Sequence, residues 1–107
     1  MILGIFMDKI AKEFALVVRN RLHSNLKKIV LFGSRARGDY KKNSDYDVLL
    51  LVKKRDKRSR EIVLNASLEM LDKYDALFGT IMCNSVDWRR KKEFPIGLNI
   101  AEEGIEL

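Results

Sequence analysis

The hydrophobic pattern along the chain predicts two long helices. Over Asp8–Leu22, apolar residues recur at helical spacing and charged residues take the opposite face, which is typical of an amphipathic helix packed on a core. The second helix is predicted over Ser59–Tyr74. Its inward-facing residues are Val63, Ala66, Met70 and Tyr74. We interpret these apolar positions as core rather than as a cofactor site.

Three shorter apolar runs, rich in β-branched and aromatic residues, predict β-strands. They cover Lys28–Phe32, Asp45–Val52 and Ala76–Cys83. The second run is almost unbroken, so this strand is expected to be buried on both faces, and helices must cover much of it. Helices and strands in this order indicate an α/β (α+β) domain of two layers, with a small mixed sheet and helices mainly on one face.

The last quarter of the chain predicts one short helix and a tail. Ser85 is expected to be the N-cap of this helix, which carries Asp87, and Pro95 is expected to end it. Ile105 and Leu107 are interpreted as exposed tail residues that could seal a homodimer or a partner interface. The sequence leaves the oligomeric state open.

Length and composition bound the class of protein. The 107 residues suffice for a single domain with one sheet and its covering helices. A hydrophobic fraction of 47% beside 34% charged residues excludes wholesale disorder. Cys83 is the only cysteine, so no internal disulfide can form, and we expect a buried thiol in a cytoplasmic protein. One cysteine and one histidine cannot build a zinc site.

The first six residues, Met1–Phe6, are apolar but too short for a membrane span or a signal segment. We therefore expect no association with a membrane. The segment is interpreted as an added strand or contact arm, or as lying before a natural start at Met7.

Basic residues outnumber acidic ones by 21 to 15, giving a net charge of +6, and the excess is clustered. One cluster contains Lys53, Lys54, Arg55, Lys57, Arg58 and Arg60, and the other is Arg89–Lys92. Such clusters can be solvated rims, can attract phosphates near a site, or can bind RNA. RNA binding is the least favoured of the three because no aromatic residues are interleaved as a stacking surface.

The candidate chemistry begins where the first predicted strand stops, at Gly33-Ser34. The segment Ser34–Arg37 predicts the first turn of a short helix. Glycine allows a ligand to approach the backbone closely, and the free N–H groups of a helix start favour anions. Gly33 and Ser34 are therefore expected to hold a triphosphate, with the Ser34 hydroxyl as an added donor.

Two arginines lie within this turn. Arg35 and Arg37 could each reach a nucleotide phosphate, or could pair instead with Asp39 or with a C-terminal glutamate. The sequence leaves these alternatives open.

Two carboxylates open the next predicted strand. Asp45 and Asp47 stand at positions i and i+2, which places both on one face of a strand while Tyr46 faces the other way. Paired oxygen ligands suit Mg²⁺ whose remaining positions are filled by water and substrate phosphates. Asp45 and Asp47 are therefore the candidate catalytic and metal-binding residues.

Together, Gly33-Ser34-Arg35-Ala36-Arg37-Gly38 and Ser44-Asp45-Tyr46-Asp47 resemble the signature of the polymerase-β-like nucleotidyltransferase superfamily. Within it, these segments resemble those of the stand-alone minimal nucleotidyltransferases, the antitoxin-type partners of helical HEPN proteins. The resemblance implies a Mg²⁺- or Mn²⁺-dependent transfer of a nucleoside monophosphate, AMP from ATP, to an acceptor hydroxyl. It also implies a HEPN-type partner, whose tyrosine is a frequent acceptor.

One position departs from the pattern of this superfamily, whose transferring members usually carry a third carboxylate on the next strand. Gly79 stands there in this chain. The nearest acids are Asp75, before the predicted strand, and Asp87, after it. This departure favours an alternative function as a non-catalytic, antitoxin-like binding protein with a degenerate nucleotide site.

Overall fold

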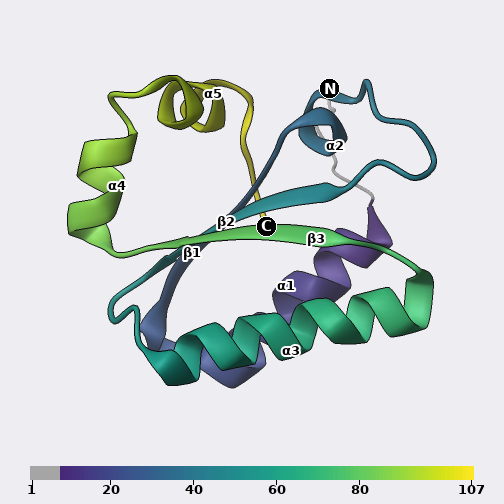
Figure 1. Cartoon of the computed structure of the whole chain (residues 1–107), viewed down its shortest axis with the longest axis horizontal. Helices are drawn as coiled ribbons and strands as arrows, with labels where there is room; N and C mark the ends of the chain where they lie inside the picture. Colours follow the sequence, from purple (N-terminus) through teal and green to yellow (C-terminus); the bar gives the residue numbers. More distant parts are fainter. Residues whose placement is uncertain (1–7) are drawn as a thin grey trace.

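The computed structural model describes residues 8–107. The interpretations of Met1–Phe6 and Met7 fall outside the described residues. The described chain forms one sheet with helices on both of its faces (Figure 1). In this range, none of the helices combines the length and apolar character needed to span a bilayer.

The sheet is mixed and has the strand order β3-β2-β1-β4. The strands are β1 Leu26–Phe32, β2 Tyr46–Val52, β3 Phe78–Cys83 and β4 Ile105–Glu106. Strand β1 pairs antiparallel with β2 and with β4, whereas β2 and β3 are parallel. The predicted α+β fold class is confirmed, and the starts of the three predicted strands differ by one or two residues from those observed.

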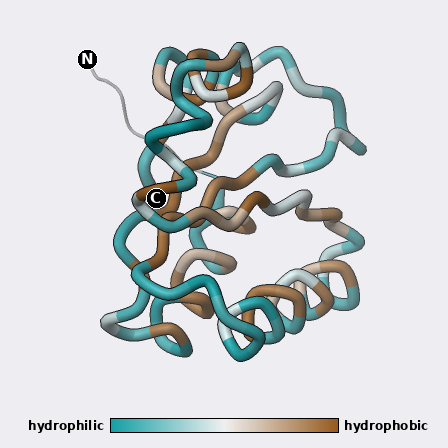
Figure 2. The backbone as a smooth tube through the Cα atoms, turned by 60° about the vertical axis from the view of Figure 1, so that its left-hand side comes forward, coloured by the Kyte–Doolittle hydropathy of each residue, from teal (hydrophilic) through white to brown (hydrophobic). Residues whose placement is uncertain are grey.

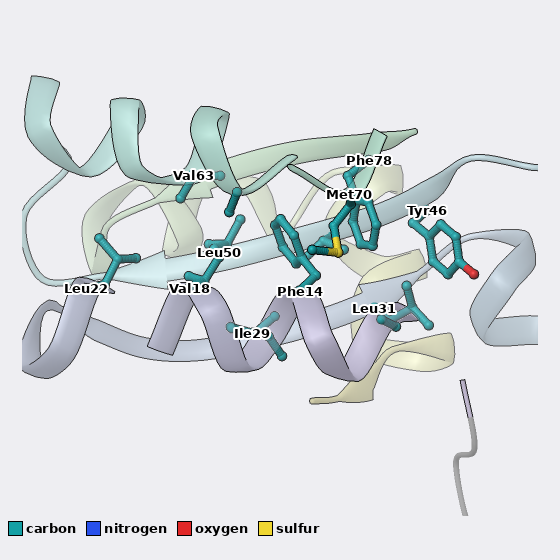
Figure 3. Packing of buried hydrophobic residues seen from close by; sticks show 14 of the residues in the cluster. Phe14, Val18, Leu22, Ile29, Leu31, Tyr46, Leu50, Val63, Met70 and Phe78 are labelled. Carbon is teal, nitrogen blue, oxygen red and sulfur yellow. The ribbon is translucent and has the colours of Figure 1, made fainter. Parts of the chain in front are cut away.

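Two long helices, α1 (Lys9–Leu22) and α3 (Lys57–Tyr74), pack against each other on one face of the sheet. The main core lies between these helices and the strands (Figure 3). Its centre is a stack of three rings, in which Phe78 lies 4.3 Å from Phe14 and 4.6 Å from Tyr46 between ring centroids. The stack joins α1, β2 and β3 at the end of the sheet where β2 begins.

The other face is covered in part by α4 (Ser85–Lys91) and α5 (Pro95–Glu103). A smaller cluster of buried residues lies there: Leu49, Cys83 and Ile100. Strand β2 is therefore buried on both faces, as its sequence predicts, and Cys83 is the expected buried thiol. In Figure 2, hydrophobic colour runs along parts of the central strands and alternates with hydrophilic colour along the helices.

The helix boundaries correct several predictions. Helix α3 begins two residues early because the Asp56 side chain accepts a hydrogen bond from the Ser59 N–H and caps the helix. Asn84, not Ser85, caps α4, and it forms a reciprocal capping box with Asp87. Tyr74, predicted as core, is 38% exposed and hydrogen-bonds to Glu13.

The C-terminal segment is more ordered than its sequence indicates. Pro95 begins α5 at the first helical position, where its missing N–H costs nothing. The prediction that Pro95 ends the preceding helix is wrong, because α4 already ends at Lys91. The tail residues Ile105 and Leu107, expected to be exposed, are half-buried. Ile105 belongs to β4, and the Leu107 N–H donates to the Ile29 carbonyl at 2.9 Å. The tail thus closes the sheet beside β1.

The ring stack leads to a prediction about stability. Replacing the fully buried Phe14 with Ala should lower the free energy of unfolding by about 3–5 kcal/mol, since it removes a large side chain and leaves a cavity. Replacing Leu16, which is 59% exposed on the same helix, with Ala should change the free energy of unfolding by about 0.5 kcal/mol or less. Urea denaturation of the two variants measures the difference, and equal losses would contradict the assignment of the core.

Candidate active site

The predicted phosphate turn and the predicted metal ligands meet at one end of the sheet. Gly33 follows β1 directly and leads into the short helix α2 (Ser34–Arg37). Asp47 lies in β2, paired with Phe32 of β1. The pairing of the two strands therefore brings Gly33 alongside Asp47, and the antiparallel register explains why residues so far apart in sequence share one site.

Gly33 is required by this arrangement for two reasons. Its φ of 73° lies in the left-handed region, which side chains disfavour. A Cβ at this position would also lie 2.3 Å from Oδ2 of Asp47, closer than any real contact. The Asp47 carboxylate thus lies over the bare backbone of the turn.

The two carboxylates differ in their surroundings. Asp45 is exposed and immediately precedes β2, whereas Asp47 is partly buried within it. Burial raises the pKa of Asp47, and the negative charge of Asp45 raises it further. Arg37 acts in the opposite direction and Glu103 adds a smaller increase. The site thus holds negative charge that its own arginine only partly offsets.

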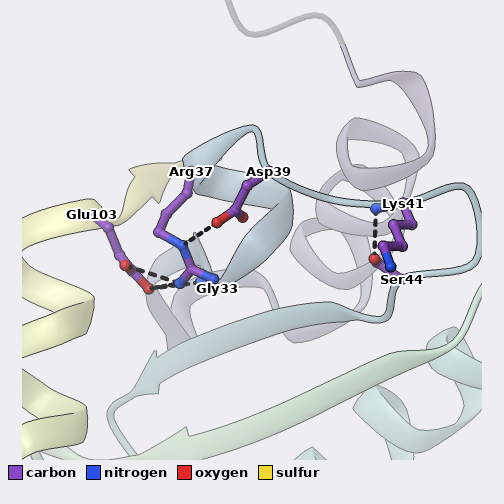
Figure 4. Close-up of polar contacts among 6 residues, drawn as sticks. All are labelled: Gly33, Arg37, Asp39, Lys41, Ser44 and Glu103. Atoms are coloured by element: carbon purple, nitrogen blue, oxygen red, sulfur yellow. Dashed lines mark hydrogen bonds and ion pairs between the residues drawn. The ribbon is translucent and has the colours of Figure 1, made fainter.

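Glu103 belongs to the site, although the sequence does not predict it there. It ends α5, and its Oε1 accepts a hydrogen bond from the Gly33 N–H at 3.0 Å (Figure 4). The contact joins positions 70 residues apart in the chain. In the sequence, the only signal for this placement is that a C-terminal glutamate can pair with an arginine of the turn.

Arg37 lies between two acids. Its guanidinium donates to Asp39 at 3.2 Å and to both carboxylate oxygens of Glu103 at 3.2 Å (Figure 4). Both ion-pair partners that the sequence left open are therefore confirmed for this arginine. Arg37 also stands close enough to Asp47 to lower its pKa, so it is near the proposed phosphate site.

Arg35 has a different place. Its guanidinium lies 4.3 Å from the Tyr40 ring centroid and 4.4 Å from that of Tyr46. It also donates to the backbone carbonyls of Lys42 and Ser44, at 3.1 to 3.2 Å. These contacts fix the loop that leads to Asp45. Its predicted phosphate contact is thus less favoured than a role in holding the loop.

Ser34 is the first residue of α2 and is half-buried at the turn. Its carbonyl accepts the hydrogen bond from the Gly38 N–H, at 2.9 Å, that closes this short helix. Ser34 therefore begins the helix directly after Gly33. Its hydroxyl contact with phosphate stays a prediction.

The position of the expected third carboxylate is next to Asp47. Gly79 of β3 pairs with Asp47, and a Cβ there would lie 3.5 Å from its Oδ1, an ordinary contact distance. Asp75 instead ends α3, and Asp87 belongs to the capping box of α4. Among residues 8–107, no group of three or more His, Cys, Asp or Glu side chains is arranged to hold a metal.

The two basic clusters lie away from the carboxylates. Lys53 follows the far end of β2, and at about 3.3 Å per residue the strand separates it from Asp47 by about 20 Å. The second cluster is at the end of α4, and Arg55 pairs with Asp87 of that helix at 3.6 Å. The first cluster therefore does not lie beside the carboxylates, and attraction of phosphate to the site is not its role.

Comparisons with known proteins agree with this geometry. A family model described as a nucleotidyltransferase domain matches residues 11–100. The chain is also 31% identical over 97 residues to a Methanocaldococcus jannaschii protein named "Putative protein adenylyltransferase MJ0604", covering 91% of this chain and 93% of that protein.

Solved structures share the fold at low sequence identity. A crystal structure of a toxin-antitoxin with AMP-PNP contains a chain that matches with a TM-score of 0.60 and 18% identity, over 89% of this chain and 70% of that one. The complex of a tri-AMPylated HEPN toxin of Shewanella oneidensis with its MNT antitoxin matches with a TM-score of 0.55 and 15% identity, over 91% and 67%.

A Gly-Ser turn packed on an Asp-x-Asp strand, within this mixed sheet, defines the nucleotidyltransferase class of domains. The chain belongs to the nucleotidyltransferase domain family, whose model matches most of its length. The resemblance on which its sequence was interpreted is therefore confirmed.

The contact between Gly33 and Asp47 leads to a matched pair of predictions. Ala at Gly38, which has the left-handed helical conformation, should cost about 1–2 kcal/mol of stability. Ala at Gly33 should cost about 1–3 kcal/mol, because its φ of 73° and ψ of −160° lie in a region that is essentially confined to glycine. Only Gly33→Ala should also displace Asp47, because a Cβ at Gly38 meets no described atom within 4 Å. Titration with Mn²⁺ should therefore show weaker binding for Gly33→Ala alone, and equal effects would contradict the site geometry.

The raised pKa of Asp47 has a consequence for stability. A carboxyl whose pKa is raised by folding favours the folded state only while it is protonated, and this contribution is lost as pH rises through the folded pKa. Asp47→Asn should therefore be more stable than the natural chain at neutral pH. The difference should vanish near about pH 3, below the ordinary pKa of Asp. Urea denaturation at both pH values tests this, and a less stable variant at neutral pH would refute it.

Proposed function

We propose that this nucleotidyltransferase transfers AMP from ATP to an acceptor hydroxyl in a Mg²⁺-dependent reaction. The proposal depends above all on the contact between Gly33 and the Asp47 carboxylate. This contact brings the proposed phosphate turn against one of the two proposed metal ligands. ATP as the nucleotide is supported by the structural match to a complex with AMP-PNP.

The donor set suits a divalent cation. Asp45 and Asp47 offer only carboxylate oxygens, and the negative charge of Asp45 contributes to the raised pKa of Asp47. Mg²⁺ or Mn²⁺ bound there would offset this charge and fill its remaining positions with water and phosphate oxygens. When bound, the cation supplies Lewis-acid stabilisation of the charge that develops on the phosphates.

The remaining residues would bind and orient the nucleotide. The Gly33 N–H, the Ser34 hydroxyl and Arg37 would hold the phosphates, while Arg35 keeps the loop before Asp45 in place. The acceptor oxygen attacks the α-phosphorus, and the bond from that phosphorus to the oxygen bridging to the β-phosphate breaks. Pyrophosphate leaves, and the hydroxyl proton passes to solvent water. Positioning of the reactants and stabilisation of the developing charge account for most of the rate acceleration in such a reaction.

A protein hydroxyl is the proposed acceptor, and a tyrosine of a HEPN-type partner is its proposed source. The name of the relative from M. jannaschii and the AMPylated HEPN toxin in the matched complex support this choice. A protein partner also suits the outer side of α3, where Leu64, Leu68 and Leu71 remain 57%, 51% and 39% exposed.

Transfer of label from α-labelled ATP into an extract of the native host tests the proposal. Label should enter a protein with the natural chain and Mg²⁺, and Asp47→Asn should lower the rate by about a hundredfold or more by removing a metal ligand. Asp72→Asn, an exposed change on α3, serves as the control. Equal transfer by Asp47→Asn would overturn the site assignment.

Gly79 supports a second candidate, a non-catalytic protein that blocks its partner by contact. No transfer together with measurable ATP binding would favour this alternative. Gly79→Asp examines the same point directly: if the absent carboxylate limits the reaction, the rate should rise by about tenfold or more. Thr80→Asp places the same charge on the neighbouring strand position, whose side chain points to the opposite face, and should give no increase.

A further inference from the structure

Two donors of the proposed phosphate site are already engaged by a carboxylate of the same chain. The Gly33 N–H donates to Glu103 Oε1 at 3.0 Å, and one guanidinium nitrogen of Arg37 donates to both Glu103 oxygens at 3.2 Å. Figure 4 shows the three groups converging at the end of α5. A carboxylate and a phosphate share this hydrogen-bonding chemistry, since each presents two anionic oxygens to N–H donors.

We propose that Glu103 is a specificity-determining residue, whose carboxylate holds the Gly33 N–H and Arg37 until the β- and γ-phosphates of a nucleoside triphosphate displace it. The inference rests on the proposed function, because it assumes that these donors bind phosphate. It goes beyond that function by giving the site an internal competitor. A ligand must then offer more negative charge than one carboxylate to occupy the same donors.

The backbone that carries Glu103 is fixed, so displacement needs only a movement of its side chain. A Cβ at the next residue, Gly104, would lie 2.5 Å from the Val30 side chain and 2.4 Å from the Ile100 carbonyl, so the chain here presses directly on β1 and α5. Strand β4 then continues the contact with β1. The Glu103 side chain, by contrast, is at the surface end of the helix and keeps 19% of its surface exposed, so solvent reaches it.

A purely structural ion pair is the competing explanation, and it makes the opposite prediction. If Glu103 only orients Arg37 and the Gly33 turn for phosphate, its removal should weaken ATP binding. If Glu103 competes with phosphate, its removal should strengthen binding, since the donors become free and one repelling charge near Asp47 is lost. Arg37 would still be held by Asp39, at 3.2 Å.

Binding of ATP and of AMP to the full chain, measured by calorimetry with Mg²⁺, separates the two explanations. Glu103→Gln removes the charge, and Glu103→Ala removes the acceptor as well. Both should tighten ATP binding by about fivefold or more, which corresponds to about 1 kcal/mol. AMP lacks the β- and γ-phosphates, so its affinity should stay within about twofold in all variants.

Glu102→Gln is the matched control, because it makes the same change in charge at the adjacent, exposed position. It should leave the affinity for ATP unchanged. Thermal denaturation of all variants verifies that each is folded, so a loss of binding cannot be assigned to unfolding.

Each outcome decides the matter. Tighter ATP binding in both Glu103 variants, with AMP and Glu102→Gln unchanged, supports the inference. Weaker or unaltered ATP binding in these variants overturns it while leaving the proposed function intact. Failure of the natural chain and of every folded variant to bind ATP overturns the proposed function and this inference with it.

Discussion

The close packing of the Gly33 backbone against the Asp47 carboxylate is the constraint on which the site depends. It requires a residue without a side chain at the end of β1, an acid at the second position of β2, and the antiparallel register that sets them beside each other. The ring stack of Phe14, Phe78 and Tyr46 lies under the same end of the sheet and holds β2 in place. The geometry of the site in this small fold therefore depends on the packing of the core.

The sequence predicts the elements whose signals are local. Periodicity is enough for α1, α3 and the three longer strands. The sequence also predicts that Asp45 and Asp47 stand at the start of a strand, although Asp45 lies one residue before β2. The exact starts of helices are more difficult to predict from sequence. The N-caps of α3 and α4 depend on whether Asp56 and Asn84, or their neighbours, adopt the non-helical conformation. Such choices differ by little in free energy, so patterns do not settle them.

The features that the sequence does not predict depend on contacts between residues far apart in the chain. Helix α5 is short, and its Pro95 reads equally well as an end or a beginning. The approach of Glu103 to Gly33 depends on how α4 and α5 cross the sheet, which no local pattern encodes. The separation of the basic clusters from the carboxylates has the same origin, because strand direction decides at which end of the sheet each loop emerges.

The reactivity of the Cys83 thiol can be used to follow opening of the helical layer that covers it. The thiol is fully buried under α4 and α5, and burial raises its pKa, so it reacts slowly with alkylating reagents while the sheet stays covered. Because it is the only cysteine, the rate of its modification measures how often the layer over β3 opens, without any engineered label. The same layer carries Glu103 at its end, so thiol chemistry can follow the lifetime of the helices that complete the site.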